Sequence, residues 1–122
     1  MMHLNYRDAR PIYTQIVDNF RNQVLTGILQ KGDRLPSVRE LASQLAINPN
    51  TIQRAYRELE MDGWIATVPG KGCFVCGQPE ESQQEQKEML KTFDQLVVTL
   101  KKQGIGTEEL IRRIQQGGTD YA

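Results

Sequence analysis

Apolar side chains recur at helical spacing in three stretches of the first half of the chain. Residues 11–26 carry them at Tyr13, Ile16, Val17, Phe20 and Val24. The stretch from Ser37 to Ala46 carries them at Val38, Leu41, Ala42 and Leu45, and the stretch from Asn48 to Gly63 carries them at Ile52, Ala55, Tyr56 and Leu59. Spacings of three and four residues put such positions on one face of a helix. The pattern therefore predicts three amphipathic helices that share a core.

Start and stop signals separate the second of these helices from the third. Ser37 and Glu40 stand in the S-x-x-E arrangement of a capping box, in which each side chain bonds the other residue's backbone N–H. Asn48 is a good N-cap and Pro49 a good first helical residue, while Gly63 is a typical stop. These signals predict two short helices joined by a tight turn.

A β-hairpin is predicted directly after the third helix. Residues 64–68 and 73–75 are strand-like, and the segment between them is Pro69-Gly70-Lys71-Gly72, a turn sequence with a cationic tip. Helix, turn, helix and hairpin in this order are what a winged helix requires. We therefore expect a mainly α fold with a small β-hairpin, that is, a winged helix-turn-helix domain.

The outward face of the predicted helix at 48–62 has the chemistry of a DNA-reading surface. It collects Asn50, Gln53, Arg54 and Arg57. Asn and Gln can pair with adenine, and Arg with guanine, in the major groove. A polar helix face is also the ordinary face of a solvated helix, so the prediction depends on the whole arrangement rather than on this face alone.

Backbone contacts are expected around that helix. Ser37 and Thr51 stand near helix N-termini, where backbone N–H groups attract phosphate. Arg39 projects from the first turn of the supporting helix, and Lys71 is flanked by glycines that allow close approach to DNA. We expect these residues to hold the phosphate backbone.

The last third of the chain predicts a different kind of segment. Residues 78–88 are polar and acidic, which indicates a linker that runs into a helix. An apolar stripe follows at Met89, Leu90, Phe93, Leu96, Val97 and Leu100. A helix with so wide an apolar face does not stay exposed in water. The stripe predicts homodimerisation, although folding back on the first domain would also cover it. A last short helix is expected after Thr107, which can cap it. The expected division is a winged helix-turn-helix domain at 1–77 and, at 78–122, a linker with a two-helix dimerisation segment.

Charge and composition add little to this picture. The formal net charge is zero, with +2 on residues 1–78 and −2 on residues 79–122. A zero sum does not exclude DNA binding, because the local placement of cations decides it. The chain contains no apolar run long enough to span a bilayer and no signal peptide. We therefore expect a cytoplasmic protein without a membrane partner.

Neither a metal site nor an enzyme is expected. Cys73 and Cys76 are three apart in a predicted strand, so their side chains should point to opposite faces. The chain has a single histidine, His3, which leaves no nucleophile–base pair and no ligand set for zinc. We expect no cofactor.

Taken together, these residues resemble the winged-helix domain of the GntR family of bacterial regulators. The resemblance covers about residues 8–76, and the matching residues are Pro11-Ile12-Tyr13, Gln15-Ile16, Gly32-Asp33-Arg34-Leu35-Pro36-Ser37, Arg39-Glu40-Leu41-Ala42, Thr51, Leu59, Asp62-Gly63, Gly70-Lys71-Gly72 and Phe74-Val75. Asn48-Pro49-Asn50-Thr51 followed by Arg54-Ala55-Tyr56 is similar to the YtrA-like branch and to its aminotransferase-fused relatives, and the short tail after the winged helix agrees with the YtrA-like branch. The predicted DNA-binding set is completed by Arg34, Asn48 and Gly72.

The resemblance implies a function, although the chain departs from the family pattern at two positions. Many other GntR regulators carry arginine where Pro49 and Gln53 stand, so their base-reading residues do not transfer to this chain. The resemblance to the YtrA-like branch implies a homodimeric repressor that binds a palindromic operator and controls a neighbouring operon, often one for an ABC transporter. Two other readings stay open. One is a sensor with a small-molecule effector of unknown identity at the helical tail or dimer interface. The other is a winged-helix interaction module such as an antitoxin.

Overall fold

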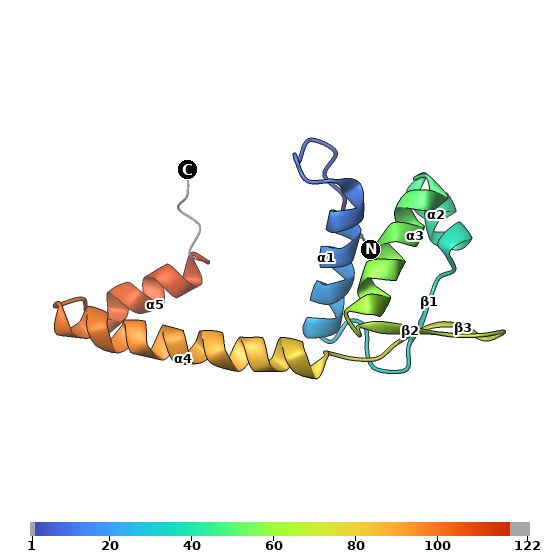
Figure 1. Ribbon diagram of the computed structural model, residues 1–122. Coiled ribbons are helices and arrows are strands. Elements are labelled where there is room, and N and C mark those ends of the chain that lie inside the picture. Colours follow the sequence, from blue (N-terminus) through green and yellow to red (C-terminus); the bar gives the residue numbers. More distant parts are fainter. Residues whose placement is uncertain (1, 118–122) are drawn as a thin grey trace. The chain divides into compact units, whose positions relative to one another are not determined.

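The computed structural model describes residues 2–117, and the chain divides into two compact units between Glu80 and Glu81 (Figure 1). The elements of the first unit are α1 (Ile12–Leu25), β1 (Arg34–Leu35), α2 (Val38–Leu45), α3 (Pro49–Met61), β2 (Ile65–Val68) and β3 (Gly72–Val75). α4 (Glu80–Lys102) begins at the boundary, and α5 (Thr107–Gln115) follows it. The three predicted helices and the hairpin are confirmed, and the fold is mainly α.

The core of the first unit lies where α1 and α3 run side by side (Figure 1). Ile16, Ile52 and Leu59 are fully buried there, and the rings of Phe20 and Tyr56 meet edge to face with centroids 5.7 Å apart. All four predicted apolar positions of α3 are buried. Burial of this face leaves the polar face of α3 as its only exposed side.

Local signals set the ends of α2 and α3 as expected. The Ser37 hydroxyl accepts the backbone N–H of Glu40 at 3.1 Å, and the Glu40 carboxylate accepts the N–H of Ser37 at 3.3 Å, so the capping box forms. Ala46 ends α2 in the left-handed region with φ 54°. The Asn48 side chain caps α3 by accepting the N–H of Asn50 at 2.9 Å. The turn between the helices therefore holds α3 at a fixed angle to α2.

The sheet has one strand more than the predicted hairpin. Its order is β1-β3-β2, antiparallel throughout, and β1 places Arg34 opposite Phe74 and Leu35 opposite Cys73. β1 has only two residues, so it is too short for an alternating pattern that would predict a strand. Its partner strand, β3, lies about forty positions further along the chain. Leu35 is buried, which ties the strand to the core.

The expected linker at residues 78–88 is mostly helix, because α4 begins at Glu80. Glu, Gln and Lys dominate this stretch and are all good helix formers, so polar composition did not imply an irregular chain. Residues 118–122 of the predicted second segment lie outside the described residues.

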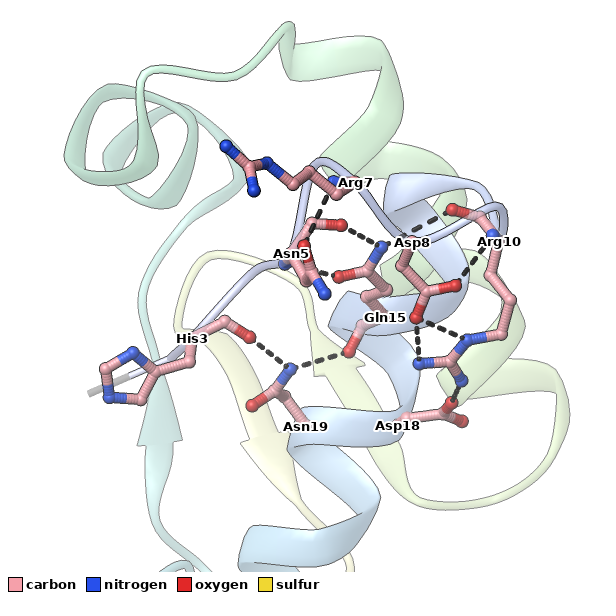
Figure 2. A network of polar contacts seen from close by, with 8 residues as sticks. All are labelled: His3, Asn5, Arg7, Asp8, Arg10, Gln15, Asp18 and Asn19. Atoms are coloured by element: carbon pink, nitrogen blue, oxygen red, sulfur yellow. Dashed lines mark hydrogen bonds and ion pairs between the residues drawn. The ribbon is translucent and has the colours of Figure 1, made fainter. Parts of the chain in front are cut away.

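Figure 2 shows how the segment before α1 is attached to that helix. Gln15 is buried, and its side chain accepts the backbone N–H of Asn5 at 2.7 Å and donates to the backbone carbonyl of Asn5 at 2.9 Å. Arg10 pairs with Asp8 and with Asp18 on α1. The backbone and side chain of Arg10 donate to Asp8 and lower the pKa of its carboxyl. These bonds fix the first turn of α1.

Three further observations concern membrane-spanning helices, metal ligands and the two cysteines. Between residues 2 and 117, no helix combines the length and apolarity needed to cross a bilayer. Over the same range, no three His, Cys, Asp or Glu side chains gather as metal ligands. Cys73 and Cys76 are both free thiols, and burial raises the pKa of Cys73.

Gly72, at the start of β3, should not tolerate a side chain. Its φ is +119°, and an added Cβ would lie 3.0 Å from Nε of Arg34. Gly72→Ala should therefore lower the free energy of unfolding by about 1–3 kcal/mol. The control is Gly70→Ala, because φ at Gly70 is +75° and a Cβ there would meet nothing within 4 Å. Urea titration would give the free energy of unfolding of each variant. Equal losses in the two variants would contradict a steric role for Arg34.

Candidate nucleic-acid interface

The outward face of α3 is presented by a fully packed helix. Asn50, Gln53, Arg54 and Arg57 are exposed, whereas Thr51 is half-buried. The opposite face packs against α1, α2 and β2. The backbone of a packed helix needs no further ordering when its side chains bind, so this face is suited to specific recognition.

The cap residues at the starts of α2 and α3 keep donors for a phosphate. The Ser37 oxygen accepts a backbone N–H, which leaves its own hydrogen free to donate. Asn48 uses its carbonyl oxygen for the cap and keeps its amide group. The predicted roles of these two residues in DNA binding are therefore compatible with their structural roles.

Loss of the Ser37 cap should destabilise α2. Ser37→Ala removes the acceptor for the Glu40 N–H, and N-cap losses cost about 0.5–2 kcal/mol. Thermal unfolding of this variant should be compared with Ser43→Ala. Ser43 is an exposed residue inside the same helix, where alanine is favourable. A neutral Ser37→Ala would show that the capping box does not hold the helix.

Two cations lie close to the tip of the hairpin β2–β3, one on its turn and one on the neighbouring strand β1. Lys71 is exposed at the turn, where Gly70 and Gly72 both have positive φ. The pairing of β1 with β3 brings Arg34 beside Gly72, with its guanidinium against the glycine. The resemblance alone suggested Arg34. The structure supplies the reason, since the residue belongs to the wing.

The cations of the first unit fall into two groups. Arg10 and Arg21 make ion pairs, with Asp8, Asp18 and Asp62. The other seven make no ion pair with any residue from 2 to 117. Two of the seven, Arg7 and Lys31, lie outside the predicted interface. The remaining five are available to a polyanion and lie on β1, α2, α3 and the hairpin, the elements predicted to contact DNA, and these are Arg34, Arg39, Arg54, Arg57 and Lys71.

Arg54 has a partner that the sequence analysis missed. Its guanidinium carbon lies 3.9 Å from the centroid of the Tyr13 ring, and its Nη2 donates to the Tyr13 hydroxyl at 3.2 Å. Tyr13 was expected in the core with the rest of the apolar face of α1, but it is only half-buried. Forty-one positions separate the two residues. No local pattern in the sequence signals a contact across that separation.

The apolar stripe of α4 is exposed. Met89, Leu90, Phe93, Leu96 and Leu100 are exposed and Val97 is half-buried. Between residues 81 and 117 no side chain is buried, although Ile105, Ile111 and Ile114 add further exposed apolar surface. The described part of the second unit thus has no buried core of its own.

Comparison with known proteins agrees with this geometry. The family model for bacterial regulatory proteins of the gntR family matches residues 12–75. The chain is 37% identical to the HTH-type transcriptional repressor YtrA of Bacillus subtilis, over 98% of this chain and 94% of that protein. It is similar to a crystal structure of a transcriptional regulator from Oenococcus oeni, with 38% identity, a TM-score of 0.64, and coverage of 95% and 98% of the two chains.

A second similar structure contains DNA. The AraR DNA-binding domain in complex with operator ORE1 is 25% identical with a TM-score of 0.53, and it covers 62% of this chain and 93% of that one. The family match spans the whole arrangement of caps, outward helix face and wing. The chain belongs to the GntR family of bacterial regulatory proteins, in its YtrA-like branch, and it is a DNA-binding transcriptional regulator rather than an enzyme.

Proposed function

We propose that the chain is a repressor that binds an inverted-repeat operator as a homodimer, with α3 in the major groove. The observation that carries the proposal is the exposed face of α3, because Asn50, Gln53 and Arg54 stand on a helix whose other face is fully buried. In helix-turn-helix proteins the N-terminal residues of the second helix contact base edges.

The surrounding residues are assigned to the phosphate backbone. We propose this role for Arg34, Ser37, Arg39, Asn48, Thr51, Lys71 and Gly72. Unpaired cations on three separate elements support the assignment, as do the free donors on the two cap residues. Phosphate contacts of this kind set the register of a protein on duplex DNA without reading its sequence.

The second copy of the chain is proposed to bind at the apolar stripe of α4. Its six residues fall within one side of the helix, and most of that surface is exposed in a single chain. Burial between two copies would remove it from water, at about 25 cal/mol for each Å² of apolar surface. We accordingly assign DNA binding to residues 1–77 and dimerisation to residues 78–122.

The sign and target of regulation are proposed from the relatives. YtrA of Bacillus subtilis, which matches nearly the whole chain, is named a repressor. We extend that role to this chain and propose control of a neighbouring operon, such as one for an ABC transporter. A regulator of this kind acts on the chromosome, hence in the cytoplasm.

The operator should be an inverted repeat in the promoter of the protein's own operon. A two-fold protein needs a two-fold site, so the half-sites should be about 10 bp apart or a multiple of that. DNase footprinting should show two protected half-sites, and moving one by about 5 bp should abolish joint protection because it rotates that half-site to the opposite side of the duplex. Protection of one asymmetric half-site at all protein concentrations would contradict the proposal.

A further inference from the structure

The contact between Arg54 and Tyr13 lies at the edge of the proposed reading face. The guanidinium carbon lies over the ring, 3.9 Å from its centroid, and Nη2 donates to the hydroxyl at 3.2 Å. Arg54 is exposed on α3, and Tyr13 lies in the first turns of α1. Arg57, one turn further along the same helix, has no such partner among the described residues. Arg54 is therefore the arginine on this face that is held by another element.

The ring of Tyr13 is itself on a fixed support. Two residues further on, Gln15 is buried and ties α1 to the backbone of Asn5 with two hydrogen bonds (Figure 2). Arg10, just before the helix, is paired with Asp18 within it. The first turns of α1 are thus anchored on both sides. Tyr13 therefore lies in a part of α1 that contacts from outside the helix hold in place.

Stacking leaves the hydrogen-bonding edge of the guanidinium free. The contact with Tyr13 uses one of the five N–H donors of the guanidinium, the one on Nη2 that is given to the hydroxyl. The remaining donors can make a bidentate contact with a phosphate. Because its guanidinium lies against Tyr13 of α1, the Arg54 side chain does not extend straight out from α3 toward the base edges of the major groove. Its position suits the DNA backbone at the groove edge.

We propose that Tyr13 is a positioning residue, which holds Arg54 so that Arg54 clamps an operator phosphate and does not read a base. The inference rests on the proposed function, since it concerns the same DNA complex. It assigns base reading on α3 to Asn50 and Gln53 alone, and it gives the exposed edge of α1 a part in DNA binding.

The stack itself can be tested without DNA. The guanidinium carbon of Arg54 lies 3.9 Å from the centroid of the Tyr13 ring, so the NMR signals of the protons on the adjacent δ carbon should be shifted upfield by the ring current. Tyr13→Leu should abolish the shift, and Tyr13→Phe should keep it because the ring remains. The δ protons of Arg57 serve as the control and should not change. An unshifted Arg54 signal in the wild-type protein would overturn the inference.

Operator binding tests the role of the stack. Arg54→Ala should weaken binding about tenfold, as loss of a charged hydrogen bond does. It should lower the slope of log K against log salt by about 0.9, as loss of one phosphate contact does. Preferences across a panel of single-base operator variants should stay unchanged. Tyr13→Leu should weaken binding about two- to fivefold, the worth of an exposed cation–π contact.

A double-mutant cycle separates positioning from a general loss of structure. Tyr13→Leu should have no further effect in the Arg54→Ala background, whereas its effect should add fully to that of Arg57→Ala. Tyr13→Phe, which conserves the ring and the packing, should bind within about twofold of wild type. These comparisons remain valid if Tyr13→Leu lowers the melting temperature, because the loss from misfolding would appear in both backgrounds.

The outcomes are distinct. Additive effects of Tyr13→Leu and Arg54→Ala, or a relaxed preference at one base pair in Arg54→Ala, would overturn the inference and leave the proposed function standing. A wild-type protein that binds no DNA from its own promoter more tightly than unrelated DNA would overturn the proposed function and the inference with it.

Discussion

Phe93→Asp should convert a dimeric protein into a monomer. Phe93 is 44% exposed in the single chain and lies within the stripe formed with Leu90, Val97 and Leu100. In a dimer built on this stripe, the substitution removes a buried aromatic ring, for which truncation costs about 3–5 kcal/mol, and adds a charge with no partner. Each 1.4 kcal/mol is a factor of ten in the dissociation constant, so the dimer should weaken by at least 100-fold.

Val98→Asp is the matched control for this substitution. Val98 lies on the same helix and is 53% exposed, but its position in the helix is on the other side from the stripe. Sedimentation velocity at micromolar concentration should show a monomer for Phe93→Asp and a dimer for Val98→Asp. Equal behaviour of the two variants would mean that the stripe is not the dimer interface.

Operator affinity should fall together with dimerisation. When two DNA-binding domains are linked in a dimer, binding of the first raises the effective concentration of the second at its half-site. Avidity of this kind raises affinity about 10²–10⁴-fold over that of a monomer. A chain truncated after Gly77 should retain its fold, since every buried side chain of the described residues lies before that point. It should be monomeric and bind a half-site and a full operator almost equally.

Predictions from the sequence were most successful where the determinants are local. The capping box at Ser37 and Glu40 and the cap at Asn48 involve residues no more than three positions apart, so their spacing alone identifies them. The buried face of α3 follows from helical periodicity in the same way. These features fix the geometry of the two helices, which is the part of the winged helix that positions the reading face.

Features that depend on distant pairing could not be predicted. β1 forms because Leu35 is buried and the strand pairs with β3. Residues 32–36 contain no pattern that predicts this strand or the position of Arg34 beside Gly72. The stack of Arg54 on Tyr13 is of the same kind. Helical spacing placed Tyr13 on the apolar face of α1 correctly, but spacing does not tell which edge of that face remains open to a neighbouring helix.

Gln53→Ala should remove sequence reading while leaving the non-specific attraction to DNA intact. Gln53 is exposed on the face of α3 whose other side is buried, and a paired contact to a base is worth about 1–3 kcal/mol of discrimination. The substitution should lower affinity for the operator by that amount and relax the preference at one position in each half-site. Asn50→Ala should do the same at a neighbouring position.

Lys71→Ala and Arg39→Ala supply the contrast, because both residues are exposed cations on elements that flank α3, and neither makes an ion pair with a described residue. Each should weaken binding to all operator variants alike and lower the salt slope by about 0.9, whereas Gln53→Ala should leave the slope unchanged. Gln95→Ala, an exposed glutamine on α4, is the control for loss of the same side chain and should change neither quantity. The measurement is fluorescence anisotropy on single-base operator variants at several salt concentrations. A Gln53→Ala protein with unaltered base preferences would show that recognition does not come from this face of α3, and sequence selection would then have to come from DNA shape or from the wing.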